Sequence, residues 1–177
     1  MGRFFSLLKT LGSCLREDAR ALRTRIFVGL ANLFPGSTTV STFVRPVLLQ
    51  LAGARVQHPC CIHAPMYIND ASGLSIGRHA FINLGVRIEG RAPVEIGAGA
   101  LIGPFVCIEN YNHRPSGTEV LPVSIGDRVW LGARVILLPG ASIGEDTVIG
   151  AGAVVAGKIP SKEYYAGPPA RRSLSVG

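Results

Sequence analysis

The chain is poor in cysteine, tryptophan and charge. Its 177 residues include four cysteines and one tryptophan, and only 16% of them are charged. Cys14, Cys60, Cys61 and Cys107 form no C-x-x-C pair and no disulfide-like spacing, which argues against a disulfide framework. We interpret the adjacent Cys60 and Cys61 as small apolar residues, buried or half-buried, of a protein in a reducing compartment.

A long uninterrupted hydrophobic run is also missing. The stretch 26–44 carries no charge, but a Pro-Gly pair and a run of Ser and Thr divide it. It is therefore a poor candidate for a membrane-spanning helix, which needs about 20 apolar residues. Lys9 interrupts the short apolar run after Arg3, so we expect no secretory signal. The start MGRFFS matches a myristoylation pattern at Gly2, which we attribute to chance.

The positive charge is unevenly distributed. The net charge is +7, and residues 1–55 hold eight Lys/Arg and two acids, whereas residues 56–177 hold ten and nine. The N-terminal segment is thus a separate basic piece, joined to a domain whose 47% hydrophobic content predicts order. This excess charge lies among apolar residues without the basic-aromatic interleaving of a nucleic-acid surface, so we expect no nucleic-acid partner.

The dominant regularity is an aliphatic residue at every sixth position, which marks a solenoid. Six residues make one short strand and a tight turn, and three such units return the chain to its starting face. Stacked triangular coils then bury one aliphatic ladder per face. The five triplets are Val56, Ile62, Ile68; Ile76, Ile82, Ile88; Ile96, Ile102, Ile108; Ile125, Leu131, Leu137; and Ile143, Ile149, Val155.

Glycine follows the ladder residue at seven of the fifteen places, namely 77, 97, 103, 126, 132, 144 and 150. Glycine suits a corner that needs a positive φ or a close backbone approach. The third unit of each triplet has no glycine there, so the three corners of a coil should differ. The residues at that corner are Asn69, Glu89, Glu109, Leu138 and Ala156.

Residues 1–55 are predicted to form a basic, amphipathic helical segment. Ser41 or Thr42 is the expected N-cap of a short helix that stops at Gly53. Two interpretations stay open: the helices cap the exposed edge of the solenoid or of a neighbouring subunit, or residues 1–52 anchor the protein on an anionic membrane. Two apolar helical faces precede that short helix, made by Phe4, Leu8, Leu11 and Leu15 and by Ile26, Leu30, Leu33 and Phe34.

The repeat is interrupted most strongly between Ile108 and Ile125, which are seventeen positions apart instead of six. A loop over residues 109–124, ENYNHRPSGTEVLPVS, therefore protrudes between the third and fourth coils. Polar loops on a rigid scaffold are where function tends to be located. This one carries His113.

Triplets of I-G-x4 with a His-bearing loop, followed by IGDRVWLGARVILLPGASIGEDTVIGAGAVV and IPSKEYYAGPPARR, resemble the hexapeptide-repeat acyltransferases. The similarity is greatest to galactoside, maltose and nodulation-type O-acetyltransferases and their polysaccharide-modifying relatives, and it covers residues 56–172. It implies a mainly β fold, with a left-handed parallel β-helix of about five coils over residues 56–160 and a C-terminal tail over 161–177. It also implies a homotrimer with active sites between subunits, acetyl-coenzyme A as donor, and no metal.

The resemblance assigns His113 as the catalytic base. Acyl transfer from a thioester to a hydroxyl or amine removes a proton from the acceptor, which suits a neutral imidazole. Asn83 stands where the second corner favours glycine, thirty residues before His113, as in the family. Its implied role is contact with the acceptor or with the tetrahedral intermediate. The alternative is a corner Asn that tolerates a left-handed backbone.

Glu109 is the other residue expected near the acceptor. Glu89 and Glu109 occupy equivalent corners of successive coils, and by resemblance either carboxylate orients His113. We prefer a plainer interpretation, in which Arg87, Arg91 or Arg114 pairs with them at a solvated rim. Cys107 is expected to pack rather than to act as a nucleophile.

The donor is expected beside the only tryptophan. By resemblance, small residues there offer free N–H groups along the pantetheine arm, and cations meet the anionic phosphates of coenzyme A. The expected channel residues are Trp130, Gly132, Ala133, Gly150 and Ala151, and the expected cations are Lys158, Arg171 and Arg172. Two positions depart from the family pattern: Ala133 replaces a common hydroxyl residue, and Arg114 separates His113 from the following proline.

The sequence thus predicts an acetyl-coenzyme-A-dependent O-acetyltransferase with direct transfer in a ternary complex. The expected acceptor is a sugar hydroxyl of a glycan, a polysaccharide precursor or a lipid-linked saccharide, in the cytoplasm or at the inner membrane face. One alternative is an N-acetyltransferase of an amino or nucleotide sugar. Another is a non-catalytic or metal-binding β-helix like γ-class carbonic anhydrases, in which His58, His63 and the poorly registered His79 would have to bind zinc.

Overall fold

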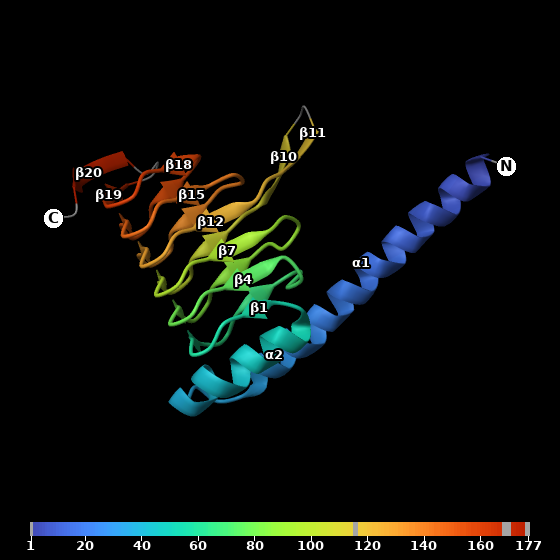
Figure 1. Cartoon of the computed structure of the whole chain (residues 1–177), viewed down its shortest axis with the longest axis horizontal. Helices are drawn as coiled ribbons and strands as arrows, with labels where there is room; N and C mark the ends of the chain where they lie inside the picture. Colours follow the sequence, from blue (N-terminus) through green and yellow to red (C-terminus); the bar gives the residue numbers. More distant parts are fainter. Residues whose placement is uncertain (1, 115–116, 168–170, 176–177) are drawn as a thin grey trace.

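A long helix and a short helical unit precede a stack of β-coils (Figure 1). The computed structural model describes the backbone of residues 2–114, 117–167 and 171–175, and the side chains of residues 9–113 and 117–167. The helical elements are α1 (Gly2–Leu33), the π-helical turn η1 (Val40–Val44) and α2 (Arg45–Ala52).

The strands are short, mostly of two or three residues. They are β1 (Arg55–Val56), β2 (Cys61–Ile62), β3 (Tyr67–Ile68), β4 (Leu74–Ile76), β5 (Phe81–Ile82), β6 (Arg87–Ile88), β7 (Val94–Ile96), β8 (Leu101–Ile102), β9 (Cys107–Ile108), β10 (Tyr111–Arg114), β11 (Gly117–Val120), β12 (Val123–Ile125), β13 (Trp130–Leu131), β14 (Ile136–Leu137), β15 (Ser142–Ile143), β16 (Val148–Ile149), β17 (Val154–Val155), β18 (Lys158–Ile159), β19 (Glu163–Ala166) and β20 (Arg171–Ser175).

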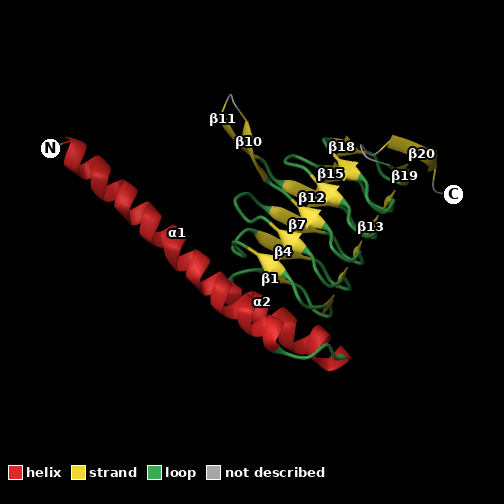
Figure 2. Cartoon of the chain, turned by 180° about the vertical axis from the view of Figure 1, so that it is seen from behind, coloured by secondary structure: helices red, strands yellow, loops and turns green. Residues whose placement is uncertain are grey.

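Three sheets form the sides of the solenoid, seen from behind in Figure 2. Sheet A has the order β1-β4-β7-β12-β15-β18, sheet B has β2-β5-β8-β13-β16-β19-β20, and sheet C has β17-β14-β9-β6-β3. The chain visits A, B and C in turn, and each strand pairs in parallel with its equivalent in the next coil. The five-coil parallel β-helix expected from the six-residue stride is confirmed.

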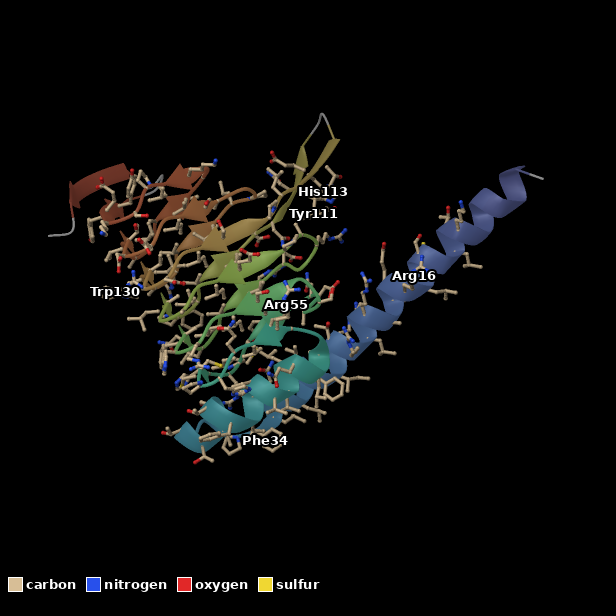
Figure 3. The ribbon with its side chains drawn as sticks, in the orientation of Figure 1. Arg16, Phe34, Arg55, Tyr111, His113 and Trp130 are labelled. Carbon is tan, nitrogen blue, oxygen red and sulfur yellow. The ribbon has the colours of Figure 1, made fainter. Side chains whose placement is uncertain are left out.

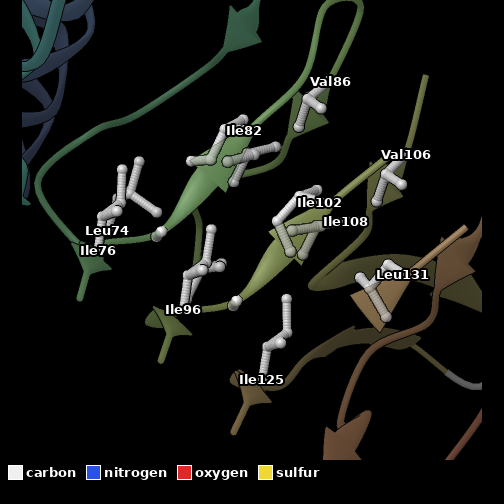
Figure 4. Close-up of a cluster of buried hydrophobic side chains, with 14 of the residues drawn as sticks. Leu74, Ile76, Ile82, Val86, Ile96, Ile102, Val106, Ile108, Ile125 and Leu131 are labelled. Carbon is white, nitrogen blue, oxygen red and sulfur yellow. The ribbon is translucent and has the colours of Figure 1, made fainter. Parts of the chain in front are cut away.

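The ladder residues lie directly above one another inside the solenoid. Ile76 pairs in register with Ile96, Ile82 with Ile102, and Ile88 with Ile108. All fifteen are at least 92% buried. Figure 4 shows part of this core, in which Ile82, Ile102 and Leu131 belong to successive coils. Burial of each branched side chain contributes about 1.5–3 kcal/mol relative to exposure, so the ladders are the main source of stability.

The corner glycines serve close approach rather than positive φ. A Cβ on Gly97 would lie 2.5 Å from the carbonyl carbon of Gly126 in the next coil, and one on Gly77 would lie 2.5 Å from the Ala98 nitrogen. Neither has a positive φ. The residues with a left-handed backbone lie two positions after these glycines. Gly99 is one of them, and Arg128 is a non-glycine residue in the equivalent position. Of the two reasons considered for glycine, the tight stacking of coils is the correct one.

The interrupting segment is a β-hairpin rather than an irregular loop. Strands β10 and β11 pair antiparallel, with His113 opposite Thr118. The base of the hairpin is held by buried Asn110, whose side-chain amide nitrogen donates to the Ala92 carbonyl and whose backbone carbonyl accepts from Leu121 N–H. The hairpin projects well beyond the coils (Figure 1).

The N-terminal segment differs from its expected form in two respects. The two apolar stretches belong to one continuous helix, α1, and Ser41 and Thr42 lie inside η1 instead of capping a helix. Gly53 does stop α2, in a left-handed conformation with φ 116°. Buried Arg45 connects α2 to α1, because its guanidinium donates to the carbonyls of Ala31, Phe34 and Pro35 at the end of α1.

One side of α1 packs on α2 and the first coil. Thr24, Val28 and Ala31 are buried there. Asn32 exchanges two hydrogen bonds with the backbone of Met66, and Thr24 accepts from Ala71 N–H. The expectation that the helices cap the solenoid edge is thus met, although the part of α1 before Glu17 projects past the coils (Figure 1).

The C-terminal region continues the solenoid beyond residue 160. Strand β19 pairs with β16, which places Tyr165 beside Ile149, and β20 folds back antiparallel on β19. The predicted tail is therefore partly an extension of sheet B. Among the described residues, no helix has the length and apolar character needed to cross a membrane.

Candidate active site

A groove of about 780 Å³ runs along the outer face of sheet B. Its walls are apolar, and its floor is formed by glycines at the corners of successive coils. The lining residues are Phe81, Asn83, Leu101, Ile102, Gly103, Pro104, Trp130, Gly132, Ala133, Val148, Ile149, Gly150, Ala151 and Tyr164. It includes Asn83 and all five residues expected beside the donor.

Sequence reasoning missed the outward-pointing residues Phe81, Leu101 and Tyr164. The available signal was the residue that precedes each ladder residue. Its side chain points outward, because side chains alternate along a strand. That position is apolar or aromatic throughout sheet B, as Cys61, Phe81, Leu101, Trp130, Val148 and Tyr164. On sheet A it is polar throughout, as Arg55, Ser75, Glu95, Ser124, Ser142 and Lys158. An outward apolar face indicates a surface that is covered by a ligand or another chain.

Asn83 is one of the residues that line this groove. Its Oδ1 accepts a hydrogen bond of 2.8 Å from the N–H of Leu84, which fixes the side chain. No partner for its Nδ2 is found within the described residues, so that donor is free to meet a ligand. The backbone of Asn83 does not adopt a positive φ, so the alternative of a left-handed corner Asn is wrong.

His113 lies on the hairpin, exposed and next to Tyr111. The Tyr111 hydroxyl is 2.5 Å from His113 Nε2, and the two rings meet edge to face with centroids 4.7 Å apart. The guanidinium of Arg91 lies 4.1 Å from the centre of the Tyr111 ring, on its face. Sequence reasoning missed Tyr111. Its position two residues before His113 on a strand, which puts both on one side, was the available signal.

His113 and the groove lie on opposite sides of a single chain. The hairpin leaves the solenoid at the edge between sheets C and A, and the groove follows the face of sheet B. In a three-sided coil, the edge between sheets C and A lies opposite the face of sheet B. Figure 3 shows His113 and Trp130 on different flanks of the molecule.

The two corner glutamates form a network with Arg87. The guanidinium donates to buried Glu89 Oε1 at 2.7 Å and lies 3.8 Å from Glu109 Oε1, and Asn69 also donates to Glu89. The preferred interpretation, ion pairing at the rim, is therefore met through Arg87. In the described part of the chain, the side chain bonded to His113 is Tyr111 and not a carboxylate.

Cys107 is protonated under ordinary conditions. Burial, together with a hydrogen bond to Glu109 Oε1 at 2.9 Å, raises the pKa of its thiol to about 12. A thiol that keeps its proton is a poor nucleophile. The packing role expected for Cys107 fits this environment.

A second, polar cleft of about 600 Å³ lies between α1 and the corners that follow sheet C. Charged residues of both signs line it, including Arg20, Arg25 and Asp70. Arg91 and Val120 connect it to the base of the hairpin, since Arg91 lies on Tyr111 and Val120 pairs with Tyr111. Such mixed charge is able to recognise a polar ligand.

Of the three predicted cations, Lys158 has a described side chain, which is exposed on sheet A and does not line the groove. Its contact with the donor stays a prediction. The backbone of Arg171 and Arg172 lies in β20, whereas their side chains fall outside the described residues. The arginine considered at the rim, Arg114, likewise has no described side chain.

The zinc alternative finds no site in the described chain. Within residues 9–113 and 117–167, no group of three His, Cys, Asp or Glu side chains is arranged to hold a metal ion. His63 contacts Cys61 Sγ and the ring of Phe81 instead.

The chain matches a family model and several known proteins. The model, bacterial transferase hexapeptide (six repeats), matches residues 122–157. A galactoside O-acetyltransferase of Escherichia coli (strain K12) is 34% identical over 72% of this chain and 66% of its own length. A putative lipopolysaccharide biosynthesis O-acetyl transferase of the same organism is 32% identical over 72% of this chain and 84% of its own. The chain spans a smaller share of several other relatives, for example 56% of the length of a putative acetyltransferase of Schizosaccharomyces pombe.

Solved structures agree. The hexapeptide-repeat acetyltransferase VCA0836 of Vibrio cholerae superposes with a TM-score of 0.82 at 26% identity, over 92% of this chain and 93% of that one. A galactoside acetyltransferase in complex with coenzyme A gives 0.83 at 27%, over 91% and 82%. The solenoid is thus the left-handed parallel β-helix of these enzymes. With its ladders, glycine corners and projecting His-bearing hairpin, the chain belongs to the hexapeptide-repeat acyltransferase family.

Proposed function

We propose that the protein is an acetyl-coenzyme-A-dependent O-acetyltransferase that acts on a saccharide hydroxyl. The relatives named for galactoside, colanic acid and lipopolysaccharide modification support a sugar acceptor in a glycan or its precursor. Related structures in complex with acetyl-coenzyme A and coenzyme A support the donor. An amine acceptor is the alternative, because the same base serves both nucleophiles.

The observation that carries the proposal is the placement of His113 opposite the apolar groove. Within the described residues, the hairpin lies away from the sheet B groove of its own chain. In a closed three-fold ring, however, the projecting edge of one copy meets the face of the next. We therefore propose a homotrimer in which each site combines His113 of one copy with the sheet B groove of its neighbour. The apolar outer face of sheet B supports such burial.

The chemistry follows from the groups at the two halves of the site. His113 takes the proton of the acceptor hydroxyl as that oxygen attacks the thioester carbonyl. The free Nδ2 of Asn83 donates to the oxyanion of the tetrahedral intermediate, a role that contributes about 10²–10³ in rate. The intermediate expels the coenzyme A thiolate, which receives the proton from the imidazolium. Ester and thiol are the products, and no covalent enzyme intermediate forms.

Tyr111 positions the base. Its hydroxyl lies closest to the Nε2 of His113, and this contact restrains the orientation of the imidazole ring. The guanidinium of Arg91 lies over the face of the Tyr111 ring. The polar cleft beside Arg91 is the part of the acceptor path that we propose for the remainder of the saccharide, with Glu109 nearby.

The proposed place of action is the cytoplasm, where acetyl-coenzyme A is made. Cys14, Cys60, Cys61 and Cys107 are all unpaired, which suits a reducing compartment.

The test is release of thiol from acetyl-coenzyme A in the presence of a panel of saccharides and amino sugars. His113→Asn should lower turnover by about 10²–10⁴ without changing the fold. His79→Asn is the matched control, since His79 is an exposed corner histidine with φ 61° that Asn accommodates. Equal activity of both variants, or transfer confined to amines, contradicts the proposal.

A further inference from the structure

The side of α1 that faces away from the solenoid is apolar. Leu22 and Ile26 are 59% and 50% exposed, whereas Thr24 and Val28 between and beyond them are buried. Two residues along a helix correspond to a rotation of about 200°, so the exposed and buried residues lie on opposite faces. The outward stripe continues in both directions along the helix, over Leu11, Leu15, Leu22, Ile26, Leu30 and Leu33.

The stripe joins further exposed apolar groups on the helical unit below the first coil. Phe43 is 64% exposed, and Val47 and Leu51 of α2 are 45% and 51% exposed. From residue 26 to residue 54 the single charged residue is Arg45, and it is buried. Ten of the eighteen large hydrophobic residues exposed in the described chain belong to this helical segment. The outer surface at this end of the molecule is thus apolar and free of charge.

Exposed cations outnumber acids along α1. At about 100° per residue, Arg16 and Arg25 flank the apolar stripe on its two sides. Lys9 and Arg20 lie nearer the face that meets the solenoid, and Arg20 and Arg25 also line the polar cleft there. Arg16 lies on the part of the helix that extends past the coils (Figure 3). A long outward apolar stripe on a helix of net positive charge complements a flat, negatively charged partner with an apolar interior.

We propose that this surface, made of the outward stripe of α1 and the exposed residues of η1 and α2, docks on an anionic lipid bilayer. The helix lies in the plane of the headgroups, with its leucines at the acyl boundary and its basic residues among lipid phosphates. The contacts of α1 with α2 and β3 stay intact, because they use the opposite face. The proposal does not depend on the catalytic assignment.

The experiment is sedimentation of the full chain with vesicles of zwitterionic phosphatidylcholine, with or without 30% phosphatidylglycerol. Binding is expected to anionic vesicles, with at least about tenfold weaker partitioning into zwitterionic ones and a decline as salt screens the lysine and arginine charges. The variant Leu22→Gln/Leu33→Gln should lower partitioning by about tenfold or more, because it removes two inserted side chains. Leu84→Gln/Leu121→Gln, which changes two exposed leucines of the β-helix, is the matched control and should bind like the parent chain.

Three results overturn the proposal. The first is failure of the parent chain to sediment with anionic vesicles. The second is equal binding by the stripe variant and the control variant, each checked for an unchanged circular dichroism spectrum. In the third, the parent chain does not bind vesicles, and the stripe variant has a different molar mass in light scattering. That combination would assign the stripe to contacts between copies of this chain.

Discussion

The Tyr111 hydroxyl lies 2.5 Å from Nε2 of His113, and both residues extend from the same side of the hairpin strand β10. This contact supplies the proposed base with a fixed orientation in a segment that is otherwise exposed. Arg91 stacks on the same tyrosine, so the ring is held between a cation and an imidazole.

Tyr111→Phe should lower kcat about three- to tenfold and leave KM for acetyl-coenzyme A unchanged. The variant retains the edge-to-face ring contact and loses only the hydrogen bond, whose net contribution is about 0.5–1.5 kcal/mol. Because that bond is made to the imidazole itself, its loss should also shift the pH profile of kcat. Steady-state kinetics across pH 5–9 measures both effects. Tyr67→Phe, at an exposed tyrosine of sheet C, is the control, and an equal change in both variants contradicts a positioning role.

Binding of coenzyme A should change the fluorescence of Trp130. It is the only tryptophan, it is 54% exposed, and it lines the sheet B groove, so the signal comes from one place. Titration of the parent chain and of His113→Asn should give the same change, since the base is not required for donor binding. Binding detected by calorimetry without any fluorescence change would place the donor elsewhere.

Cys107→Ala should retain activity within a few-fold, whereas a covalent nucleophile would be indispensable. Thiol release measured for the variant tests this directly. Its stability should also respond less to alkali. The thiol pKa is raised from 9.0 to about 12 in the fold, so the unfolded chain loses this proton above pH 9 while the folded chain keeps it. That contribution to stability is present below pH 9 and is lost as the pH approaches 12. Urea midpoints at pH 8 and pH 10.5 should fall more for the parent chain than for Cys107→Ala.

Gly97→Ala should destabilise the fold by about 1–3 kcal/mol, because the added methyl group would lie 2.5 Å from the backbone of the next coil. Gly29→Ala is the contrasting change, since nothing lies within 4 Å of its Cβ position in α1. It should stabilise the chain by up to about 1 kcal/mol through helix propensity. Thermal denaturation separates the two, and equal shifts contradict the role assigned to the corner glycines.

The coils could be predicted because one requirement repeats in every turn. Each ladder position must be a buried aliphatic residue, so Ile76, Ile82 and Ile88 recur every six positions and reveal one coil. The hairpin strands carry no such requirement. Their described residues are mostly polar and mostly exposed, and their pairing follows from hydrogen bonds between backbone groups, which leave no side-chain pattern.

The lining of the groove could be predicted, but the arrangement of the site as a whole could not. Asn83 follows β5, and Trp130 and Gly132 lie at β13 two strands along the same sheet, so their common groove follows from the stride. That His113 lies opposite this groove depends on which corner the hairpin leaves, and spacing alone does not settle it. The contact that connects α1 to α2 through buried Arg45 could not be predicted either, because a charged residue in a sequence is normally expected to be exposed.

The central claim is that each active site is shared between two copies of the chain. Co-expression of His113→Ala and Asn83→Ala under different tags, followed by purification through both tags, yields trimers that contain each variant. Each of the two variants expressed alone should be nearly inactive. In a mixed trimer one site in three combines an intact His113 with an intact Asn83, so about one third of the parent activity should return. Mixed trimers as inactive as the two separate variants would contradict the account.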